Sequence, residues 1–150
     1  MSTHSAQLTW RPAAGDEFLR GRYTRLHEIA FDGGATIMGS PSPSVVREPF
    51  SSAAAVDPEE MFLASIASCH MLWFLDVARR AGLAILSYRD QPEAILEKNA
   101  DGRTAVSRVT LRPAVECEGD RTKLADIHRR AHDACFITNS VKSEVVVEPQ

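Results

Sequence analysis

The sequence predicts an α+β fold, on two observations. A long, strongly apolar helical segment occupies the middle of the chain, and segments with strand patterning and turn signals lie on both sides of it. The order that follows is a β meander, a long helix, a hairpin, a second helix and a final strand. At 150 residues the chain has the size of one domain, and we expect residues 1–150 to form a single domain.

The first third of the chain is predicted to be β structure. In residues 23–31 apolar and polar side chains alternate as in a strand, with Leu26 out of phase. The turn signal Asp32-Gly33-Gly34 then leads into residues 35–38. We expect a hairpin here. Between residues 39 and 56, three prolines and five serines indicate an irregular loop. A loop of this length suggests that it covers a site or contacts a partner.

The long helix is predicted to follow this loop. Asp57 can cap it, Pro58 suits the first helical position, and two acidic residues occupy the first turn. The helix should run to about Ala81, and Gly82 ends it. Apolar side chains cover nearly its whole circumference, so we expect burial on all sides. A chain of 150 residues struggles to wrap such a helix alone, which predicts a homodimer.

Two extended segments come next. Residues 84–98 and 104–118 are joined by a turn signal at residues 99–102. In the second segment apolar and polar side chains alternate, which is typical of a half-buried strand. Pro113 interrupts that segment and favours an edge strand or a bulge.

A second helix and a last strand end the chain. Asp120 can cap a helix that runs to about Cys135, and residues 145–147 have the composition of a strand. The helix carries one stripe of largely apolar residues, namely Leu124, Ile127, His128, Ala131 and Cys135.

Composition narrows the class of protein. With 44% apolar residues, 25% charged residues and a net charge of -3, the chain has no basic cluster, so we expect no nucleic-acid partner. The N-terminus lacks the regions of a signal peptide, and the apolar stretch from Met61 to Leu75 is shorter than the ~20 residues of a membrane span. Three cysteines without CxxC spacing indicate neither a secreted disulfide framework nor a zinc ribbon. We therefore expect a cytoplasmic protein without membrane contact.

Two of the cysteines are candidates for chemistry. Cys69 and Cys135 each lie in a helical segment that faces the core, and they are either buried filler or a redox pair. Cys69 is in mid-helix, where the helix dipole gives a thiolate no help, so it needs an external cation. Cys135 lies near a helix C-terminus, which suits a resolving thiol better than an attacking one. Cys117 alternates with the apolar face of its strand and is best interpreted as filler.

Histidines offer a different interpretation. His128, His132 and Cys135 follow i, i+4, i+7 spacing on one helix face, and Cys69-His70 could complete a set of metal ligands. The spacing matches no known structural zinc site. These residues are otherwise polar histidines at an interface.

The chain resembles the OsmC/Ohr family of osmotically inducible and organic hydroperoxide resistance proteins. The resemblance rests on Glu59 ten residues before the first cysteine, on Ala67-Ser68-Cys69-His70-Met71, and on the element Cys135-Phe136-Ile137-Thr138-Asn139-Ser140. It extends to Tyr23-Thr24-Arg25, the hairpin and the final strand. The OsmC-like branch is the closer match, because Phe136 stands where peroxidase members often carry proline.

This resemblance implies an OsmC-like fold, with antiparallel sheets around a long buried central helix in an intertwined homodimer. It implies a thiol-dependent peroxidase that acts on organic hydroperoxides in the stress response, with two active sites at the dimer interface. No cofactor or metal is implied. The reductant would be a small or lipoyl-linked dithiol.

The resemblance also implies roles for four residues. Cys69 matches the peroxidatic cysteine and Cys135 the resolving one, so a Cys69 sulfenic acid would condense to a Cys69–Cys135 disulfide. Glu59 matches the active-site glutamate, and Arg25 is the best match to the active-site arginine, with Arg22 next. An arginine stays charged beside a thiolate and can donate to the leaving oxygen, and a carboxylate can hold it in place.

Helix geometry places Glu59 and Cys69 about 15 Å apart along one helix, at 1.5 Å per residue. They cannot share a site within one straight helix, so we expect Glu59 to reach Cys69 of the partner subunit. Two other functions remain open: a non-catalytic dimeric module that binds a small apolar ligand, and a metal-binding protein that uses the histidines.

Overall fold

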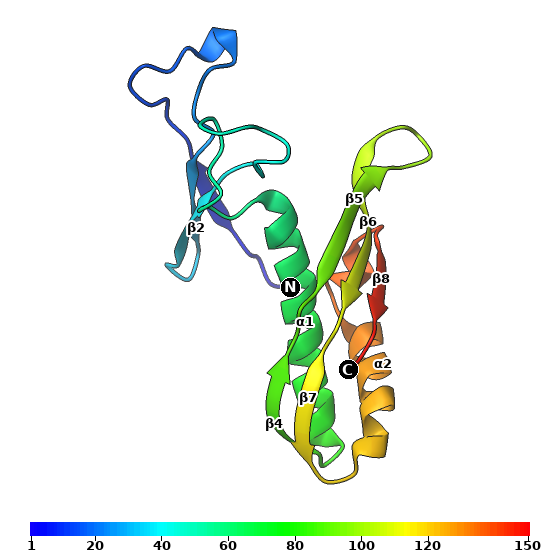
Figure 1. The fold of residues 1–150 in the computed structure, drawn as a ribbon. Helices are drawn as coiled ribbons and strands as arrows, with labels where there is room; N and C mark the ends of the chain where they lie inside the picture. The colour runs from blue at the N-terminus through cyan, green and yellow to red at the C-terminus, as the bar shows by residue number, and fades with distance from the viewer. The chain divides into compact units, whose positions relative to one another are not determined.

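The computed structural model describes residues 1–150 as two compact units, Met1–Met61 and Phe62–Gln150 (Figure 1). The architecture confirms the predicted α+β class, with mainly antiparallel sheets and one long helix.

The first unit contains a three-stranded antiparallel sheet in the order β1-β2-β3. Its strands are β1 (Ala6–Thr9), β2 (His27–Phe31) and β3 (Thr36–Gly39). The predicted hairpin is confirmed, since Ile29 of β2 faces Ile37 of β3 in the register. The sequence analysis missed β1, whose four residues are all exposed and therefore give no apolar alternation.

Strand β2 is shorter than predicted. It begins at His27 and not at Tyr23, because the backbone before it bonds to loops. The N–H of Thr24 donates to the Asp16 carboxylate at 3.2 Å, and the N–H of Arg25 donates to the Phe50 carbonyl at 3.1 Å. These bonds replace the sheet bonds that the predicted strand would have made. The loop between β3 and the long helix has no regular structure, as predicted.

Helix α1 (Pro58–Arg80) starts and stops as the sequence predicts. The N–H of Glu60 donates to the Asp57 carboxylate at 2.7 Å, and the N–H of Asp57 donates to the Glu60 carboxylate at 2.9 Å. This reciprocal pair is a capping box. Gly82 follows the helix with φ of 72°, a left-handed conformation that favours glycine.

One face of α1 differs from the prediction of burial on all sides. Ile66, Phe74 and Ala78 are fully buried, whereas Leu72 is 60% exposed. The single chain therefore leaves an apolar face uncovered. The sequence also predicted an apolar stretch too short to span a membrane, and this is wrong. Helix α1 has 23 residues and an 18-residue window of mean hydropathy 1.6, so its length and composition would be enough for a membrane span. Core helices of globular proteins meet the same criterion, and α1 packs against protein on its buried face.

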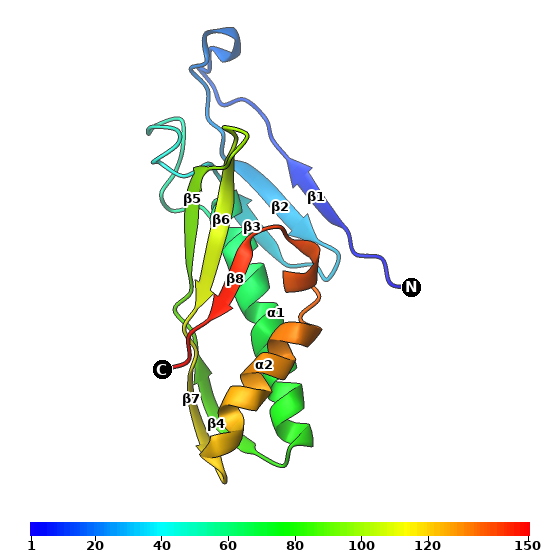
Figure 2. The same cartoon turned by 90° about the vertical axis from the view of Figure 1, so that its right-hand side faces the viewer.

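The second unit packs two small sheets and a second helix around α1 (Figures 1 and 2). Residues 84–89 pair antiparallel with residues 114–118, and residues 93–98 pair antiparallel with residues 104–111. Together they form the predicted hairpin, and each arm is broken near a proline, Pro92 in the first and Pro113 in the second. The N–H of Arg112 donates to the Asp90 carboxylate at 2.7 Å across the break. The strands are β4 (Ala84–Arg89), β5 (Glu93–Lys98), β6 (Thr104–Leu111) and β7 (Ala114–Glu118).

The C-terminal part adds helix α2 (Leu124–Ala134) and strand β8 (Glu144–Val147). Asp120 caps a 3-10 turn, Arg121–Lys123, that leads into α2, so the helix starts later than predicted and ends just before Cys135. Strand β8 pairs with β6 in parallel. Figure 2 shows α2 lying beside α1, and the apolar cluster between them includes Phe74, Ile127 and Ala131.

Candidate active site

The structure brings Cys69 and Cys135 together within the second unit. Cys69 lies in the middle of α1 and is partly buried, while Cys135 directly follows α2 and is 0% exposed. Both thiols are free, and Cys135 lies close enough to Cys69 to raise the pKa of the Cys69 thiol. Packing α2 against α1 is what makes residues so distant in the sequence neighbours. A pair of neighbouring thiols can become a disulfide when one sulfur is oxidised.

The surroundings of Cys69 oppose its ionisation overall. Burial raises the pKa of the Cys69 thiol most, and the neighbouring Cys135 thiol raises it further. Hydrogen bonds from the backbone at Ile137 and Phe136 act in the other direction and lower the pKa. No cation contributes to this balance. A reactive thiolate at Cys69 therefore needs a positive charge brought to it.

A short loop after α2 supplies these backbone donors. The backbone at Phe136 and Ile137 lowers the pKa of the Cys69 thiol, and the N–H of Thr138 donates to the Cys135 Sγ at 3.4 Å. Consecutive backbone amides near a sulfur favour negative charge on it.

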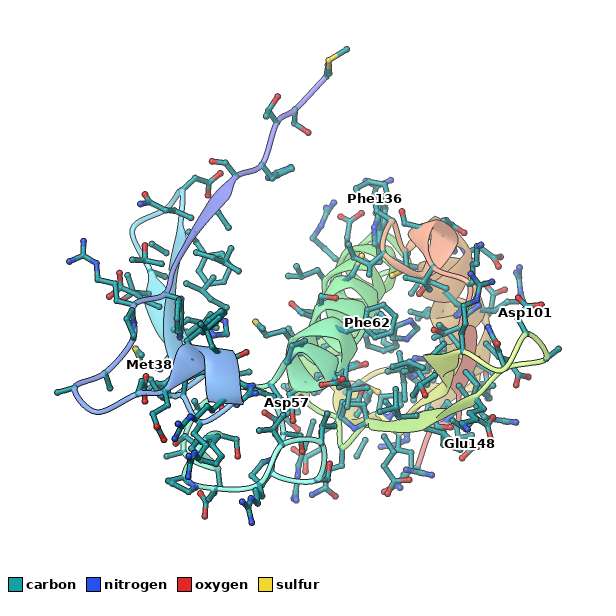
Figure 3. All side chains as sticks on the ribbon, turned by 90° about the horizontal axis from the view of Figure 1, so that it is seen from above. Met38, Asp57, Phe62, Asp101, Phe136 and Glu148 are labelled. Atoms are coloured by element: carbon teal, nitrogen blue, oxygen red, sulfur yellow. The ribbon has the colours of Figure 1, made fainter.

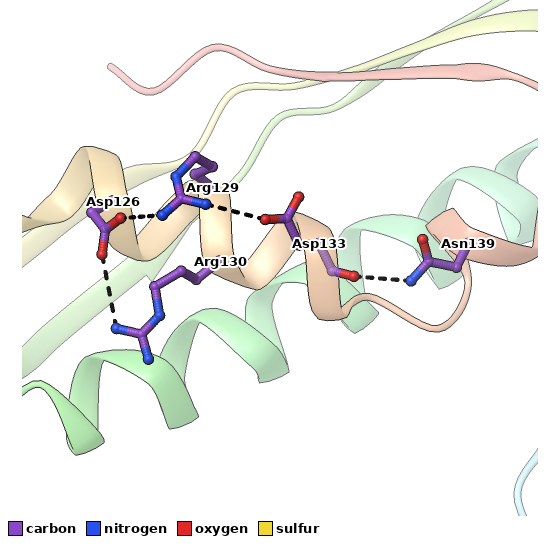
Figure 4. Close-up of polar contacts among 5 residues, drawn as sticks. All are labelled: Asp126, Arg129, Arg130, Asp133 and Asn139. Carbon is purple, nitrogen blue, oxygen red and sulfur yellow. Dashed lines mark hydrogen bonds and ion pairs between the residues drawn. The ribbon is translucent and has the colours of Figure 1, made fainter.

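Asn139 and Ser140 hold this loop in shape. The Asn139 Nδ2 donates to the main-chain carbonyl of Asp133 at 3.0 Å, as Figure 4 shows, and so closes the end of α2. The Ser140 Oγ donates to the carbonyl of Phe136 at 2.7 Å. The Asn-Ser pair of the sequence element therefore has a structural role: it fixes the loop that carries the amides.

A cavity of about 310 Å³ opens beside Cys69. Its lining is mainly apolar and consists of Cys69, Leu72, Trp73, Asp76 and Phe136. The rings of Trp73 and Phe136 meet edge to face at 5.4 Å. Phe136, labelled in Figure 3, is 69% exposed, so this ring forms an outer wall of the cavity. The cavity can hold an organic group next to the thiol.

Arg25 and Glu59 lie together in the first unit. Both line a cavity of about 500 Å³ whose other walls include Trp10, Phe18 and Tyr23. The Arg25 guanidinium lies 4.1 Å from the centre of the Tyr23 ring and donates to the Tyr23 carbonyl at 3.1 Å. Arg25 and Glu59 form no ion pair with each other. Arg22 does not line this cavity and is paired with Glu17 at 2.9 Å.

The histidines are inside the second unit and are not at an open metal site. His70 Nε2 and His128 Nδ1 are 3.1 Å apart, and both residues are buried. Burial lowers the pKa of each to about 4, and the charges of His128 and His132 contribute to the lowering at His70. No group of three or more His, Cys, Asp or Glu side chains lies close enough to hold a metal ion. The predicted metal interpretation has no ligand set.

Comparison with known proteins identifies the fold family. The family model described as OsmC-like protein matches residues 51–150. This segment contains Cys69, Cys135 and the loop that follows Cys135. The chain belongs to the OsmC-like family. A search of curated proteins gave no match to this OsmC-like chain.

Solved structures agree with this assignment. An OsmC-like protein of unknown function from Vibrio cholerae O1 biovar eltor is 45% identical, with all of both chains covered and a TM-score of 0.96. The organic hydroperoxide resistance protein OhrB of Bacillus subtilis is 22% identical, covers 97% of this chain and 98% of its own, and has a TM-score of 0.65. An organic hydroperoxide resistance protein from Legionella pneumophila is 15% identical, with 99% and 96% covered and a TM-score of 0.66. The last two likenesses concern the fold.

Sequence reasoning missed two parts of this OsmC-like protein. The backbone amides of residues 136–138 carry no residue-type signal, and only the helix-ending position of Cys135 hints at them. The aromatic cluster of the first unit, with Phe18 and Tyr23 rings 4.7 Å apart, has no periodic spacing that would reveal it. The structure groups the four predicted residues as two pairs, one pair in each unit.

Proposed function

We propose that this OsmC-like protein is a cysteine-based peroxidase that reduces organic hydroperoxides. The observation that carries the proposal is the proximity of the Cys69 and Cys135 thiols beside an apolar cavity. Membership of a family whose structural relatives include organic hydroperoxide resistance proteins supports a peroxide-related stress role.

The reaction follows from the chemistry of the pair. The Cys69 thiolate attacks the terminal oxygen of ROOH, the O–O bond breaks, and the alkoxide takes a proton and leaves as ROH. Cys69 is then a sulfenic acid. The Cys135 sulfur attacks the Cys69 sulfur, water leaves, and a disulfide forms. An external dithiol reduces this disulfide and becomes oxidised itself, so that ROOH and dithiol yield ROH, water and a disulfide.

Arg25 enters the proposal as the source of the missing cation, and Glu59 as the carboxylate that holds the arginine in place. No positively charged side chain affects the pKa of the Cys69 thiol. Arg25 is the predicted arginine, and it lines a cavity with Glu59. An arginine beside the sulfur would favour the thiolate and donate to the leaving oxygen. We propose that the protein acts as a homodimer, in which Glu59 serves Cys69 of the partner subunit.

The substrate is proposed to be organic. Leu72, Trp73 and Phe136 surround the space next to Cys69, and an apolar lining gains more from an alkyl or aryl group than from hydrogen peroxide. The carrier of the reducing dithiol is proposed to be a small or lipoyl-linked molecule.

A Cys69→Ser variant tests the function directly. Wild type should consume cumene hydroperoxide in the presence of a dithiol, and Cys69→Ser should not. Cys117→Ser is the matched control, since Cys117 lies on β7 away from the pair, and it should keep full activity. The proposal fails if wild type is inactive or if Cys69→Ser is as active as the control.

A second candidate function is non-catalytic binding of a small apolar ligand. The aromatic side chains Trp10, Phe18 and Tyr23 around the 500 Å³ cavity of the first unit favour it. This function predicts ligand binding that Cys69→Ser leaves unchanged, together with a wild type that consumes no hydroperoxide.

A further inference from the structure

We infer that the hydrogen bond between His70 and His128 is a positioning device: it sets the register of α1 against α2 and thereby holds the Cys69 thiol against Cys135. The inference rests on the redox role proposed for the cysteines. Neither histidine takes part in the chemistry proposed above. Their role would be exerted through the sulfurs that their helices carry.

The two histidines are placed to do this. His70 directly follows Cys69 on α1, and His128 lies on α2 about two turns before Cys135. The ring nitrogens Nε2 of His70 and Nδ1 of His128 are 3.1 Å apart. No other hydrogen bond joins a side chain of α1 to a side chain of α2. His70 is 0% exposed and His128 is 4% exposed, so water does not compete for the bond.

Apolar side chains also pack between the two helices. Phe74, Val77 and Ala78 of α1 pack with Ile127 and Ala131 of α2. Apolar contacts are not directional, and they would tolerate a small slide of one helix along the other. A hydrogen bond weakens steeply with distance and angle, so it defines one register. A slip by one residue moves a helix about 1.5 Å, and a disulfide requires Cα atoms within about 7 Å.

Burying two imidazoles at this interface is costly, which argues for a specific use. The pair shares one hydrogen bond, and the second nitrogen of His70, Nδ1, is buried without a partner. A polar group buried without a partner costs free energy, whereas apolar residues of similar size could fill the same space. Buried polar pairs in such positions serve to select one arrangement over others. Here the arrangement selected is the one in which the two thiols are neighbours.

The measurement is the equilibrium of the Cys69–Cys135 pair with glutathione, which needs no hydroperoxide. Both cysteine thiols are oxidised to a disulfide, and one glutathione disulfide is reduced to two glutathione molecules that take the two thiol protons. The equilibrium constant gives the effective concentration of one thiol at the other. Mass spectrometry of quenched protein in a Cys117→Ser background reads the fraction of disulfide.

Two variants on different helices remove the bond. In His128→Leu and in His70→Met, the effective concentration should fall about tenfold, which corresponds to the net contribution of one hydrogen bond. Two conservative variants keep a donor at the bonding position. His128→Asn carries its amide nitrogen where Nδ1 was, and His70→Gln carries its amide nitrogen where Nε2 was, so both should stay close to wild type. His132→Leu, on α2 without a bond to α1, is the matched control and should be unchanged.

The outcomes separate the two proposals. Folding of each variant is checked by circular dichroism, and one folded apolar variant suffices because each removes the same bond. If neither apolar variant folds, the amide variants still test the proposal: they keep the bond, so a tenfold loss in them contradicts the positioning role. Wild-type effective concentrations in a folded His128→Leu or His70→Met also overturn it. A wild type that ignores cumene hydroperoxide would overturn the peroxidase proposal and leave this equilibrium measurable.

Discussion

The side-chain amide of Asn139 donates a 3.0 Å hydrogen bond to the main-chain carbonyl of Asp133, the residue two positions before Cys135. The bond joins the end of α2 to the turn Thr138–Ser140 and spans the loop that holds Cys135. Figure 4 shows it at the end of a helix that carries its own surface ion pairs, from Arg129 to Asp126 and Asp133 and from Arg130 to Asp126. Such exposed pairs contribute little each, whereas the Asn139 bond closes the loop together with the bond from Ser140 to Phe136.

Replacing Asn139 should loosen the cysteine loop. In Asn139→Ala the Asp133 carbonyl loses its partner, and we expect the free energy of unfolding to fall by about 1 kcal/mol. The looser loop should also slow formation of the Cys69–Cys135 disulfide. Urea unfolding and timed mass spectrometry measure the two effects. Lys142→Ala, an exposed site beyond the turn, is the control, and equal disulfide rates in both variants would contradict the prediction.

Removing Cys135 should stop the proposed reaction after its first half. Cys135→Ser keeps the attacking thiol, so one equivalent of cumene hydroperoxide should be consumed once and should leave a Cys69 sulfenic acid. Dimedone traps this species as an adduct that mass spectrometry maps to Cys69. Wild type should give the disulfide and little adduct, because Cys135 is a neighbour of Cys69. Finding the adduct on Cys117 would contradict the prediction that Cys69 is the attacking thiol.

Much of the fold was predictable because its signals are local. The capping box at Asp57, the glycine after α1 and the hairpin turns are set by neighbouring residues, and the structure confirms them. Features that depend on distant packing were not predictable. The parallel pairing of β8 with β6 follows from where α2 leads the chain, and β1 has no buried residue to mark it.

The candidate site divides in the same way. The sequence indicated four candidate residues: Cys69, Cys135, Arg25 and Glu59. It could not show that the two cysteines lie together in one unit and that Arg25 and Glu59 line one cavity in the other. His128 and His132 were correctly placed on one helix. Their spacing could not show that His128 forms a hydrogen bond with His70 of α1. Only tertiary packing decides whether a histidine at such a position meets a metal, solvent or another imidazole.

Arg25 should control the ionisation of Cys69 if it supplies the missing cation. In Arg25→Met the pKa of the Cys69 thiol should rise by about one unit or more, which lowers the thiolate fraction near neutral pH about tenfold. The rate of iodoacetamide alkylation of Cys69 between pH 5 and 10, in a Cys117→Ser background, reads this shift. Arg22→Met is the control, because Arg22 is paired with Glu17 outside the cavity. Equal pH profiles in the two variants would remove Arg25 from the site.

Stability should depend on pH through the buried histidines. The pKa of His70 and of His128 is about 4, below the ordinary 6.5, because burial disfavours the charged ring and because His128 and His132 repel a charge on His70. Phe74 stacks on His128 and offers no compensating charge. The unfolded chain therefore binds more protons than the folded chain between pH 6.5 and 4. The free energy of unfolding therefore has its full value above pH 6.5 and decreases as the pH falls to 4. The decrease is at most about 3 kcal/mol for each histidine.

Urea unfolding at pH 7, 5.5 and 4.5 measures this loss. His70→Met removes one titrating group and should reduce the slope of stability against pH, whereas His4→Leu, at the exposed N-terminus, should leave it as in wild type. A slope that is the same in His70→Met and wild type would mean that His70 is not held in its neutral form by the fold.

Phe136 should help to select the substrate. Its ring forms the exposed wall of the cavity beside Cys69 and contacts Trp73 edge to face. Phe136→Ala removes apolar contact with a bulky hydroperoxide, so KM for cumene hydroperoxide should rise about five- to tenfold, the value of one aromatic contact. Hydrogen peroxide has no organic group to place against the ring, and its KM should not change. Leu86→Ala on β4, equally exposed and outside the cavity, is the control. A parallel rise in KM for both peroxides would show that the ring affects the thiol itself and not the organic group.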